Sequence, residues 1–339
     1  GAFCNKVHII ASFKGKMFDQ RRINNMSESQ IPSQSEIELG SAITSSADTV
    51  AEMLDQGQAL FEQSGVYFGH GTDNAWDEAV YLLSFVLGLA PDVDRTVLEK
   101  SLTPQQQAAI LALYQRRIEE RIPAAYLTGR AWFCGLPFAV DERVIIPRSP
   151  IAEMIMTGFE PWCVNEPRRV LDLCTGSGCI GIACAYAFEE AEVVLSDISP
   201  EALQVTAANI AQHKLGYRVS AVESDLFQQM SGEQFQLIVS NPPYVDAEDY
   251  ASMPDEYQHE PEIALASGSD GLDFTRRLLR EAADHLTEEG VLVVEVGNSL
   301  VALERDFPSV PFLWLEFSEG DGGVFLLTRE QLLEHRESF

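Results

Sequence analysis

Three glycines at positions 176, 178 and 181 follow the apolar run 170–173 and precede a helix-forming segment. Glycine lets the backbone approach a ligand where a Cβ atom would clash, and the first turn of a helix carries unpaired N–H groups. The spacing satisfies GxGxxG, and Asp197 ends the next apolar run, where a carboxylate can accept both hydroxyls of a ribose. These residues predict a site for an adenosine-containing cofactor. They allow both NAD and S-adenosylmethionine.

The sequence Asn241-Pro242-Pro243-Tyr244 follows another apolar run, 237–240, so we expect it at the carboxyl end of a strand, facing the same crevice. The two prolines lack N–H donors, which leaves the Asn241 side-chain oxygen and a main-chain carbonyl as acceptors. Acceptors bind an –NH2 group, and Tyr244 offers a flat apolar face to a planar group. This combination predicts methyl transfer to an amide or exocyclic amine nitrogen. It favours S-adenosylmethionine over NAD, because an NAD-dependent dehydrogenase would have no use for an amine-binding motif.

Strands and helices alternate after residue 168, and this alternation predicts the sheet that positions both motifs. We expect strands at 170–174, 193–197, 219–222, 235–240 and 291–296, and helices at 179–188, 199–214 and 272–286. The alternation is typical of a doubly wound α/β sheet. Two further strands, at 312–317 and 324–328, are expected as an antiparallel pair at its edge.

The preceding part of the chain predicts a small helical domain and a β-hairpin. Thr103, Pro104 and Gln106 form a capping box with proline at the first helical position. Apolar residues flank turn residues at Gly135 and Asp141-Glu142, which predicts the hairpin. The expected domains are a leader or extension outside the fold, a helical domain, a hairpin linker and the α/β domain, at 1–26, 27–130, 131–150 and 151–339.

Composition excludes several classes of function. The chain has 339 residues and a net charge of -29, which repels a phosphate backbone, so we expect no duplex DNA binding and a basic partner instead. No apolar run approaches the roughly 18–20 residues that cross a bilayer, so we expect no membrane association.

The basic N-terminal stretch lacks the apolar core of a signal peptide, and we predict a cytoplasmic protein. Cysteines at 174, 179 and 184 are interpreted as small apolar residues rather than metal ligands.

The two motifs, together with the run ending Ile146-Pro147-Arg148, resemble the glutamine N5-methyltransferases that modify release factors and ribosomal proteins. This resemblance implies a Rossmann-like class I methyltransferase sheet, S-adenosyl-L-methionine as cofactor, and an N-terminal helical domain that helps to select the protein substrate. The segments 67–74, 131–135 and 314–317 resemble the branch that acts on large-subunit ribosomal protein three. Release-factor enzymes usually read Pro-Arg-Pro-Glu where this chain has Pro-Arg-Ser149-Pro150, which favours a basic ribosomal protein of the large subunit as substrate.

The resemblance also implies roles for individual residues. The cofactor-binding set is Asp172, Thr175, Gly176, Ser177, Gly178, Asp197, Asp225 and Asn241. Within it, Asp197 matches the ribose acid and Asp225 the acid near the adenine amine. The clamp on the glutamine amide is Asn241, Pro242, Pro243 and Tyr244. Arg148 and Glu295 match positions near the site without an assigned role.

Three alternatives stay open from the sequence. A release-factor glutamine methyltransferase would use the same clamp. So would an enzyme that methylates an exocyclic amine of RNA or DNA, although the charge of -29 disfavours it. A ribosome-assembly factor without catalysis would leave the intact motifs unexplained. No general base is assigned, because the positively charged N-methylated amide that methyl transfer produces is acidic enough to lose a proton to solvent.

The acidic segment 245–273 generates a prediction about the substrate. It holds nine acids and no Lys or Arg, and it begins directly after the clamp. It shows no clear periodicity before Leu272, so we expect a long loop. We expect it and the acidic helical domain to attract a basic protein by long-range electrostatics. As salt rises from 0.1 to 1 M, the Debye length falls from about 10 to 3 Å. The kcat/KM for an intact protein substrate should fall steeply over that range, and that for a short neutral peptide with the same glutamine should change little. Parallel curves would contradict this.

Overall fold

The computed structural model describes residues 47–90, 93–163, 165–318 and 322–339. The described chain divides into two compact units. Unit 1 comprises the segments 47–130 and 254–259, and unit 2 comprises 131–253 and 260–339. The leader predicted at 1–26 lies outside the described residues. Within those residues, no helix combines the length and the apolar character needed to cross a membrane.

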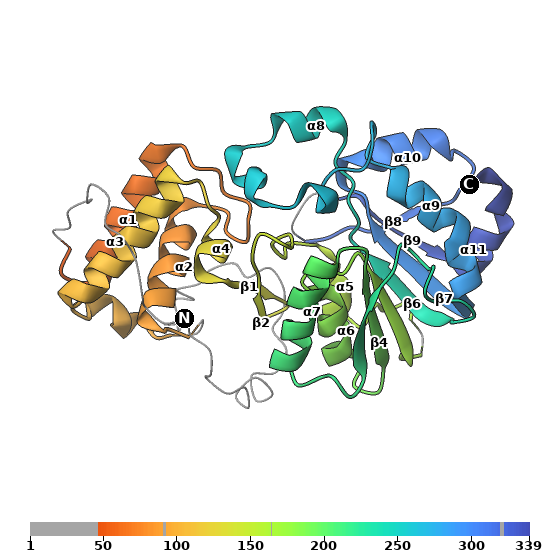
Figure 1. The fold of residues 1–339 in the computed structure, drawn as a ribbon, viewed down its shortest axis with the longest axis horizontal. Helices are drawn as coiled ribbons and strands as arrows, with labels where there is room; N and C mark the ends of the chain where they lie inside the picture. Colours follow the sequence, from red (N-terminus) through yellow and green to blue (C-terminus); the bar gives the residue numbers. More distant parts are fainter. Residues whose placement is uncertain (1–46, 91–92, 164, 319–321) are drawn as a thin grey trace, which may run out of the picture. The chain divides into compact units, whose positions relative to one another are not determined.

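Unit 2 is built on a seven-stranded sheet in the order β5-β4-β3-β6-β7-β9-β8 (Figure 1). The strands β3 to β7 pair in parallel, and β9 pairs antiparallel with both β7 and β8. The α/β fold and the antiparallel pair at the sheet edge are therefore confirmed. The strand bounds are β3 Arg169–Leu173, β4 Glu192–Asp197, β5 Val219–Glu223, β6 Phe235–Ser240, β7 Leu286–Glu295, β8 Leu313–Trp314 and β9 Val324–Thr328.

Helices cover both faces of this sheet (Figure 1). One face packs against α5 (Ile151–Met156), α6 (Cys179–Ala187) and α7 (Pro200–Gln212), and the other against α9 (Asp273–Glu281), α10 (Leu300–Asp306) and α11 (Arg329–Glu334). Alternate side chains of each central strand enter the two cores. Because β3 and β6 are buried on both faces, their sequences are nearly continuous apolar runs. That is why these strands were predictable.

Several predicted elements differ in extent. The helix expected at 272–286 ends as α9 at Glu281, and a 3-10 turn, η5 (Ala282–His285), leads into β7. β7 begins at Leu286, five residues before the predicted start, and β8 is only two residues long. The polar run from Thr287 to Glu289 hides the start of β7, because it breaks the apolar pattern of the strand.

The hairpin and the acidic segment also differ from the prediction. The hairpin consists of β1 (Arg130–Phe133) and β2 (Leu136–Ala139), and the chain from 140 to 150 is irregular. The acidic segment contains α8 (Ala247–Ser252) and the 3-10 turns η3 (Asp255–His259) and η4 (Glu262–Ala264), although the sequence predicted a loop. These elements are too short to produce a periodicity. The Asp246 carboxylate caps α8 by accepting hydrogen bonds from the N–H groups of Glu248 and Asp249.

Unit 1 is a helical bundle, as predicted. Its helices are α1 (Val50–Ser64), α2 (Ala75–Leu87), α3 (Pro104–Glu119) and α4 (Ala124–Thr128), with a 3-10 turn η2 (Arg95–Glu99). The predicted capping box of Thr103 and Gln106 starts α3. Residues 254–259 pack with this bundle, because the buried Arg117 guanidinium pairs with the carboxylates of Glu78 and Glu256.

Close packing of α6 against the sheet generates a stability prediction. A Cβ atom on Gly181 would lie 2.0 Å from Leu195 Cδ2 and 3.0 Å from Asp172 Cβ. We therefore expect Gly181→Ala to lower the free energy of unfolding by about 1–3 kcal/mol through overpacking. Denaturant unfolding measures this. The control is Gly322→Ala, since no heavy atom lies within 4 Å of a Cβ built there. Equal stability of the two variants would refute the close approach.

Candidate active site

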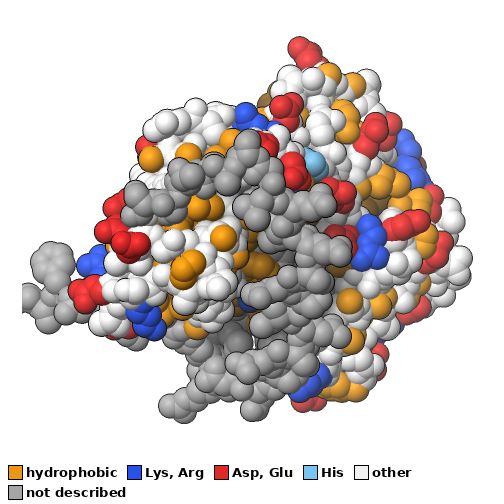
Figure 2. All heavy atoms as spheres, turned by 60° about the vertical axis from the view of Figure 1, so that its left-hand side comes forward, with side chains coloured by type: hydrophobic (Ala, Val, Ile, Leu, Met, Phe, Trp, Pro, Cys, Tyr) orange, Lys and Arg blue, Asp and Glu red, His pale blue; other side chains and the backbone are white. Residues whose placement is uncertain are grey.

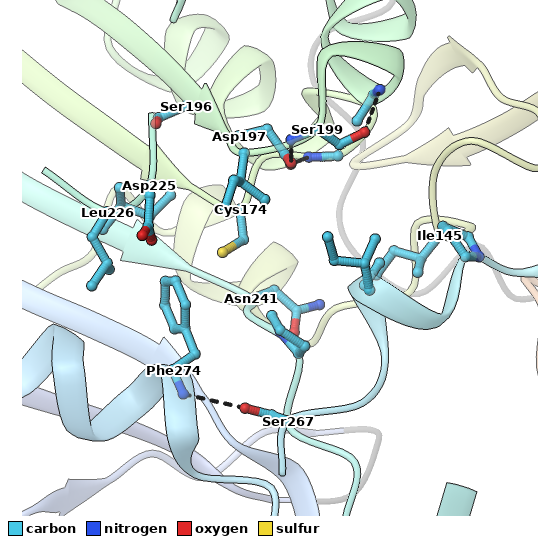
Figure 3. Close-up of a pocket in the computed structure, with 18 of the residues that line it drawn as sticks. Ile145, Cys174, Ser196, Asp197, Ser199, Asp225, Leu226, Asn241, Ser267 and Phe274 are labelled. Atoms are coloured by element: carbon cyan, nitrogen blue, oxygen red, sulfur yellow. Dashed lines mark hydrogen bonds between the residues drawn. The ribbon is translucent and has the colours of Figure 1, made fainter. Parts of the chain in front are cut away.

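A cavity of about 330 Å³ lies at the carboxyl ends of the central strands of unit 2 (Figure 3). Its size suits a small-molecule ligand, and its place is where open α/β sheets bind ligands. The strand ends and the loops that follow them contribute Cys174, Gly176, Asp197, Ile198, Asp225, Leu226, Asn241 and Pro243. Phe274 from α9 and Ile263 from η4 also line the cavity.

A buried carboxylate fixes the glycine loop. Asp172 Oδ2 accepts hydrogen bonds from Thr175 Oγ1 at 2.6 Å and from the Gly181 N–H at 2.8 Å. Gly176 and Gly178 have φ values of 54° and 84°, in the left-handed region that glycine adopts without a steric penalty. The loop therefore turns sharply between β3 and α6. Asp172 itself is fully buried and is not part of the cavity lining.

The Asp172 carboxylate also influences the electrostatics of the site. Burial raises its pKa to about 7, against the opposing hydrogen bonds from Thr175 and Gly181. Its Oδ1 atom is buried and has no hydrogen-bond partner among the described residues. A buried acceptor without a partner is unfavourable, so a ligand that brought an N–H group or a positive charge near Asp172 would be stabilised.

Asp197 connects the glycine loop to the start of α7. Its Oδ2 accepts from the Gly176 N–H at 2.9 Å, and its Oδ1 accepts from the Ser199 N–H at 3.0 Å (Figure 3). Burial raises the pKa of this carboxyl, opposed by these backbone hydrogen bonds. Each carboxylate oxygen can accept more than one hydrogen bond. The carboxylate is therefore held in place and can still accept the two hydroxyls of a ribose.

An acid and two apolar side chains form another side of the cavity. Figure 3 shows Asp225 near Leu226, with the Phe274 ring directly below the Asp225 carboxylate in this view, and all three residues line the cavity. Flat apolar surfaces of this kind suit a purine ring. Asp225 is also paired with Arg277, whose Nη2 lies 2.8 Å from each carboxylate oxygen. Sequence reasoning found Asp225 but missed Leu226, Phe274 and Arg277, since apolar residues and single arginines from separate elements form no motif.

The clamp sequence leaves one acceptor unused. Asn241 Oδ1 is buried, and no described residue donates a hydrogen bond to it. In Figure 3 the Asn241 side chain lies within the group of residues that line the cavity. Pro243 joins it in the lining, whereas Pro242 and Tyr244 do not line the cavity. The Tyr244 hydroxyl donates instead to Glu295 Oε1 at 2.8 Å.

The structure divides the predicted site residues into two groups. The residues that line the cavity are Gly176, Asp197, Asp225, Asn241 and Pro243. The residues that do not are Asp172, Thr175, Ser177, Gly178, Pro242 and Tyr244. The binding roles of the residues in both groups stay predictions. Cys174 lines the cavity and was not predicted to; burial raises the pKa of its thiol well above the usual range, so the sulfur stays neutral.

Two segments of the chain match known protein families. Residues 155–255 match the family described as "Methyltransferase small domain", and residues 52–129 match the "PrmC N-terminal domain". The first match contains the glycine loop and the clamp. The second lies within the helical part of unit 1.

Curated relatives match most of the chain. A ribosomal protein uL3 glutamine methyltransferase of Francisella tularensis is 46% identical over 299 residues, which cover 88% of this chain and 95% of the relative. The enzyme of the same name from Neisseria gonorrhoeae is 48% identical over 287 residues, 84% of this chain and 96% of the relative. Among solved structures, the human methyltransferase 10 domain containing protein is similar with a TM-score of 0.41 and 16% identity, covering 57% of this chain and 87% of that one.

The position of Asp197 generates a binding prediction. If its carboxylate accepts two ribose hydroxyls, Asp197→Ala should weaken S-adenosylmethionine binding by about 1.5–3 kcal/mol, the range for hydrogen bonds to a charged group. Isothermal titration calorimetry measures the affinity. The control is Asp284→Ala, because Asp284 is exposed and pairs with Arg336. An unchanged affinity for the Asp197 variant would place the ribose elsewhere.

Proposed function

The chain belongs to the family of ribosomal protein uL3 glutamine methyltransferases, and on that premise we propose how its side chains hold the cofactor and the glutamine. It is a protein-glutamine methyltransferase that uses S-adenosyl-L-methionine to methylate a glutamine of ribosomal protein uL3. The family, enzyme class, cofactor and substrate predicted from the sequence are confirmed. The residue roles below are our proposal.

The cavity of unit 2 fits the cofactor. Asp197 would accept the ribose hydroxyls, and Leu226 and Phe274 would enclose the adenine, with Asp225 accepting its amino group. The unpartnered Asp172 Oδ1 would attract the positive charge of the methionine part. When bound, the cofactor supplies a methyl group that is already activated by its sulfonium centre. The protein therefore has to align and stabilise the groups rather than activate the methyl.

Asn241 and the carbonyl of Pro242 would hold the glutamine amide. An amide nitrogen is a poor nucleophile because its lone pair is delocalised into the carbonyl. Two fixed acceptors orient the –NH2 group and stabilise the positive charge that develops on the nitrogen during transfer. The prolines supply no competing N–H donor and keep the backbone rigid. The amide proton leaves to solvent, so we assign no general base.

The charge of the chain supports a basic substrate. Its net charge is -29, and Figure 2 shows Asp and Glu side chains spread over one face of the molecule rather than gathered in one patch. A surface of this sign attracts a protein rich in Lys and Arg, and it repels nucleic acid. We place the reaction in the cytoplasm, before or during assembly of the ribosomal protein into its particle, with the helical unit contributing to substrate selection.

One observation carries the residue assignment: the buried Asn241 Oδ1 at the cavity has no donor among the described residues. Buried acceptors in folded proteins are normally paired, and a substrate N–H would pair this one. The two residues that follow Asn241 cannot supply the donor, because both are prolines and lack N–H groups.

Removal of this acceptor generates a kinetic prediction. Asn241→Ala should keep cofactor binding and lower the single-turnover rate by about 10²–10³, the effect of removing a preorganised polar group at the reacting centre. Methyl transfer from labelled cofactor to purified uL3 measures the rate. Asn165→Ala is the matched control, since Asn165 is exposed and does not line the cavity. A near-normal rate for the Asn241 variant would remove that residue from the clamp.

A further inference from the structure

Tyr244 occupies a tightly built position. A Cβ atom on Gly297 would lie 2.6 Å from Tyr244 Cε2, and one on Gly271 would lie 2.1 Å from the Tyr244 carbonyl oxygen. Both glycines have positive φ, 47° and 76° respectively. Ser299 Oγ donates to the same carbonyl at 2.9 Å. Neighbouring segments therefore pack closely against the Tyr244 ring and hold the backbone at the end of the clamp.

The tyrosine hydroxyl is held by a buried carboxylate. Glu295 ends β7 and is only 6% exposed. Its Oε1 accepts from the Tyr244 hydroxyl at 2.8 Å, and its Oε2 accepts from Ser149 Oγ at 2.5 Å. The two oxygens thus each receive one hydroxyl from a different segment, one before the sheet and one after β6. Ser149 lies where the resemblance places a proline in release-factor enzymes, and a proline has no hydroxyl to donate.

We infer that Glu295 is a positioning residue that sets the Tyr244 ring of the glutamine clamp, and that the Ser149 hydroxyl keeps its carboxylate turned toward Tyr244. The inference rests on the proposed function, because it gives Tyr244 a place beside the substrate amide. Neither Glu295 nor Tyr244 lines the cavity, and Glu295 contacts the clamp through the hydrogen bond that it accepts from the Tyr244 hydroxyl. Small displacements of a positioning group lower transfer rates strongly, which is why a fixed ring matters for this reaction.

The hydrogen bonds that hold Tyr244 and Ser149 to Glu295 depend on pH. Burial raises the pKa of Glu295, while the hydrogen bonds from Ser149 and Tyr244 and the charge of Arg148 oppose that rise. Arg148 is itself paired with Glu260 at 2.6 Å. The ionised carboxylate accepts two hydroxyls, and this arrangement is lost as pH falls through the pKa. Ser149→Ala removes one stabilising hydrogen bond from the ionised form, so the pKa rises further.

A double-mutant cycle tests the coupling. We expect Tyr244→Phe and Glu295→Gln each to lower kcat for uL3 methylation by about 10- to 100-fold, the effect of losing a hydrogen bond to a charged group. Because Glu295 acts through Tyr244, the second substitution should add no further loss. The kcat of the double variant should therefore be no lower than that of the slower single variant. Losses that multiply in the double variant would overturn the inference.

The acidic limb of the pH–rate profile gives a second readout. In Ser149→Ala the acidic limb should move to higher pH. In Ser149→Thr, which keeps a hydroxyl, the limb should return to its position in the unmodified enzyme. An unmoved limb in Ser149→Ala would also overturn the inference. Should Glu295→Gln not fold, the cycle of Ser149→Ala with Tyr244→Phe asks the same question. Glu304→Gln is the matched control, because its carboxylate accepts from the Trp314 indole N–H at 2.7 Å and lies outside the cavity lining.

The same data separate this inference from the proposed clamp. Failure of the clamp would appear as normal methylation by both Asn241→Ala and Tyr244→Phe. Failure of the inference alone would appear as slow methylation by Tyr244→Phe, combined with multiplying losses in its double variant with Glu295→Gln. Cofactor affinity should stay unchanged in Glu295→Gln, and a parallel loss of affinity would assign Glu295 to the cofactor cavity instead.

Discussion

The parallel pairing of β3 with β6 is the constraint on which the site depends. Leu173 lies opposite Ser240 in this pairing, and Ser240 Oγ donates to the Leu173 carbonyl at 2.8 Å. The next residues of the two strands begin the glycine loop and the clamp. Parallel strands end at the same edge of a sheet, so the cofactor loop and the clamp reach one cavity although they are distant in sequence. The sheet thereby places residues of both motifs in one cavity.

The second general feature of the site is an excess of hydrogen-bond acceptors over donors. Asp172 Oδ1 and Asn241 Oδ1 are buried without partners among the described residues, and Asp197 has lone pairs to spare. Such a cavity favours a ligand with positive charge and N–H groups, which describes both the cofactor and a glutamine amide. The burial of the carboxylates strengthens these interactions, since water does not compete for the acceptors.

The sheet and the two motifs were predictable because their signals are local. Apolar runs identify β3, β4 and β6, glycines at fixed spacing identify the loop, and two consecutive prolines identify the clamp. The surroundings of Tyr244 were not predictable, because Ser149 and the stretch from Glu295 to Gly297 are distant from Tyr244 in the sequence, and only the fold brings them together. Asp172 was predicted at the cofactor; in the structure its Oδ2 secures the turn into α6, a role that depends on a contact with Gly181. The short helices of the acidic segment gave no periodicity to detect.

The central claim is that fixed acceptors select the amide of the substrate. The most direct measurement is the affinity of the enzyme, in the presence of S-adenosylhomocysteine, for a uL3 peptide with the target glutamine and for the same peptide with glutamate. A glutamate carboxylate offers only acceptors, so it would face Asn241 Oδ1 and the Pro242 carbonyl without a hydrogen bond. We predict that the glutamate peptide binds at least about tenfold more weakly, from the penalty of unpaired buried acceptors. Equal affinities for the two peptides would contradict the account.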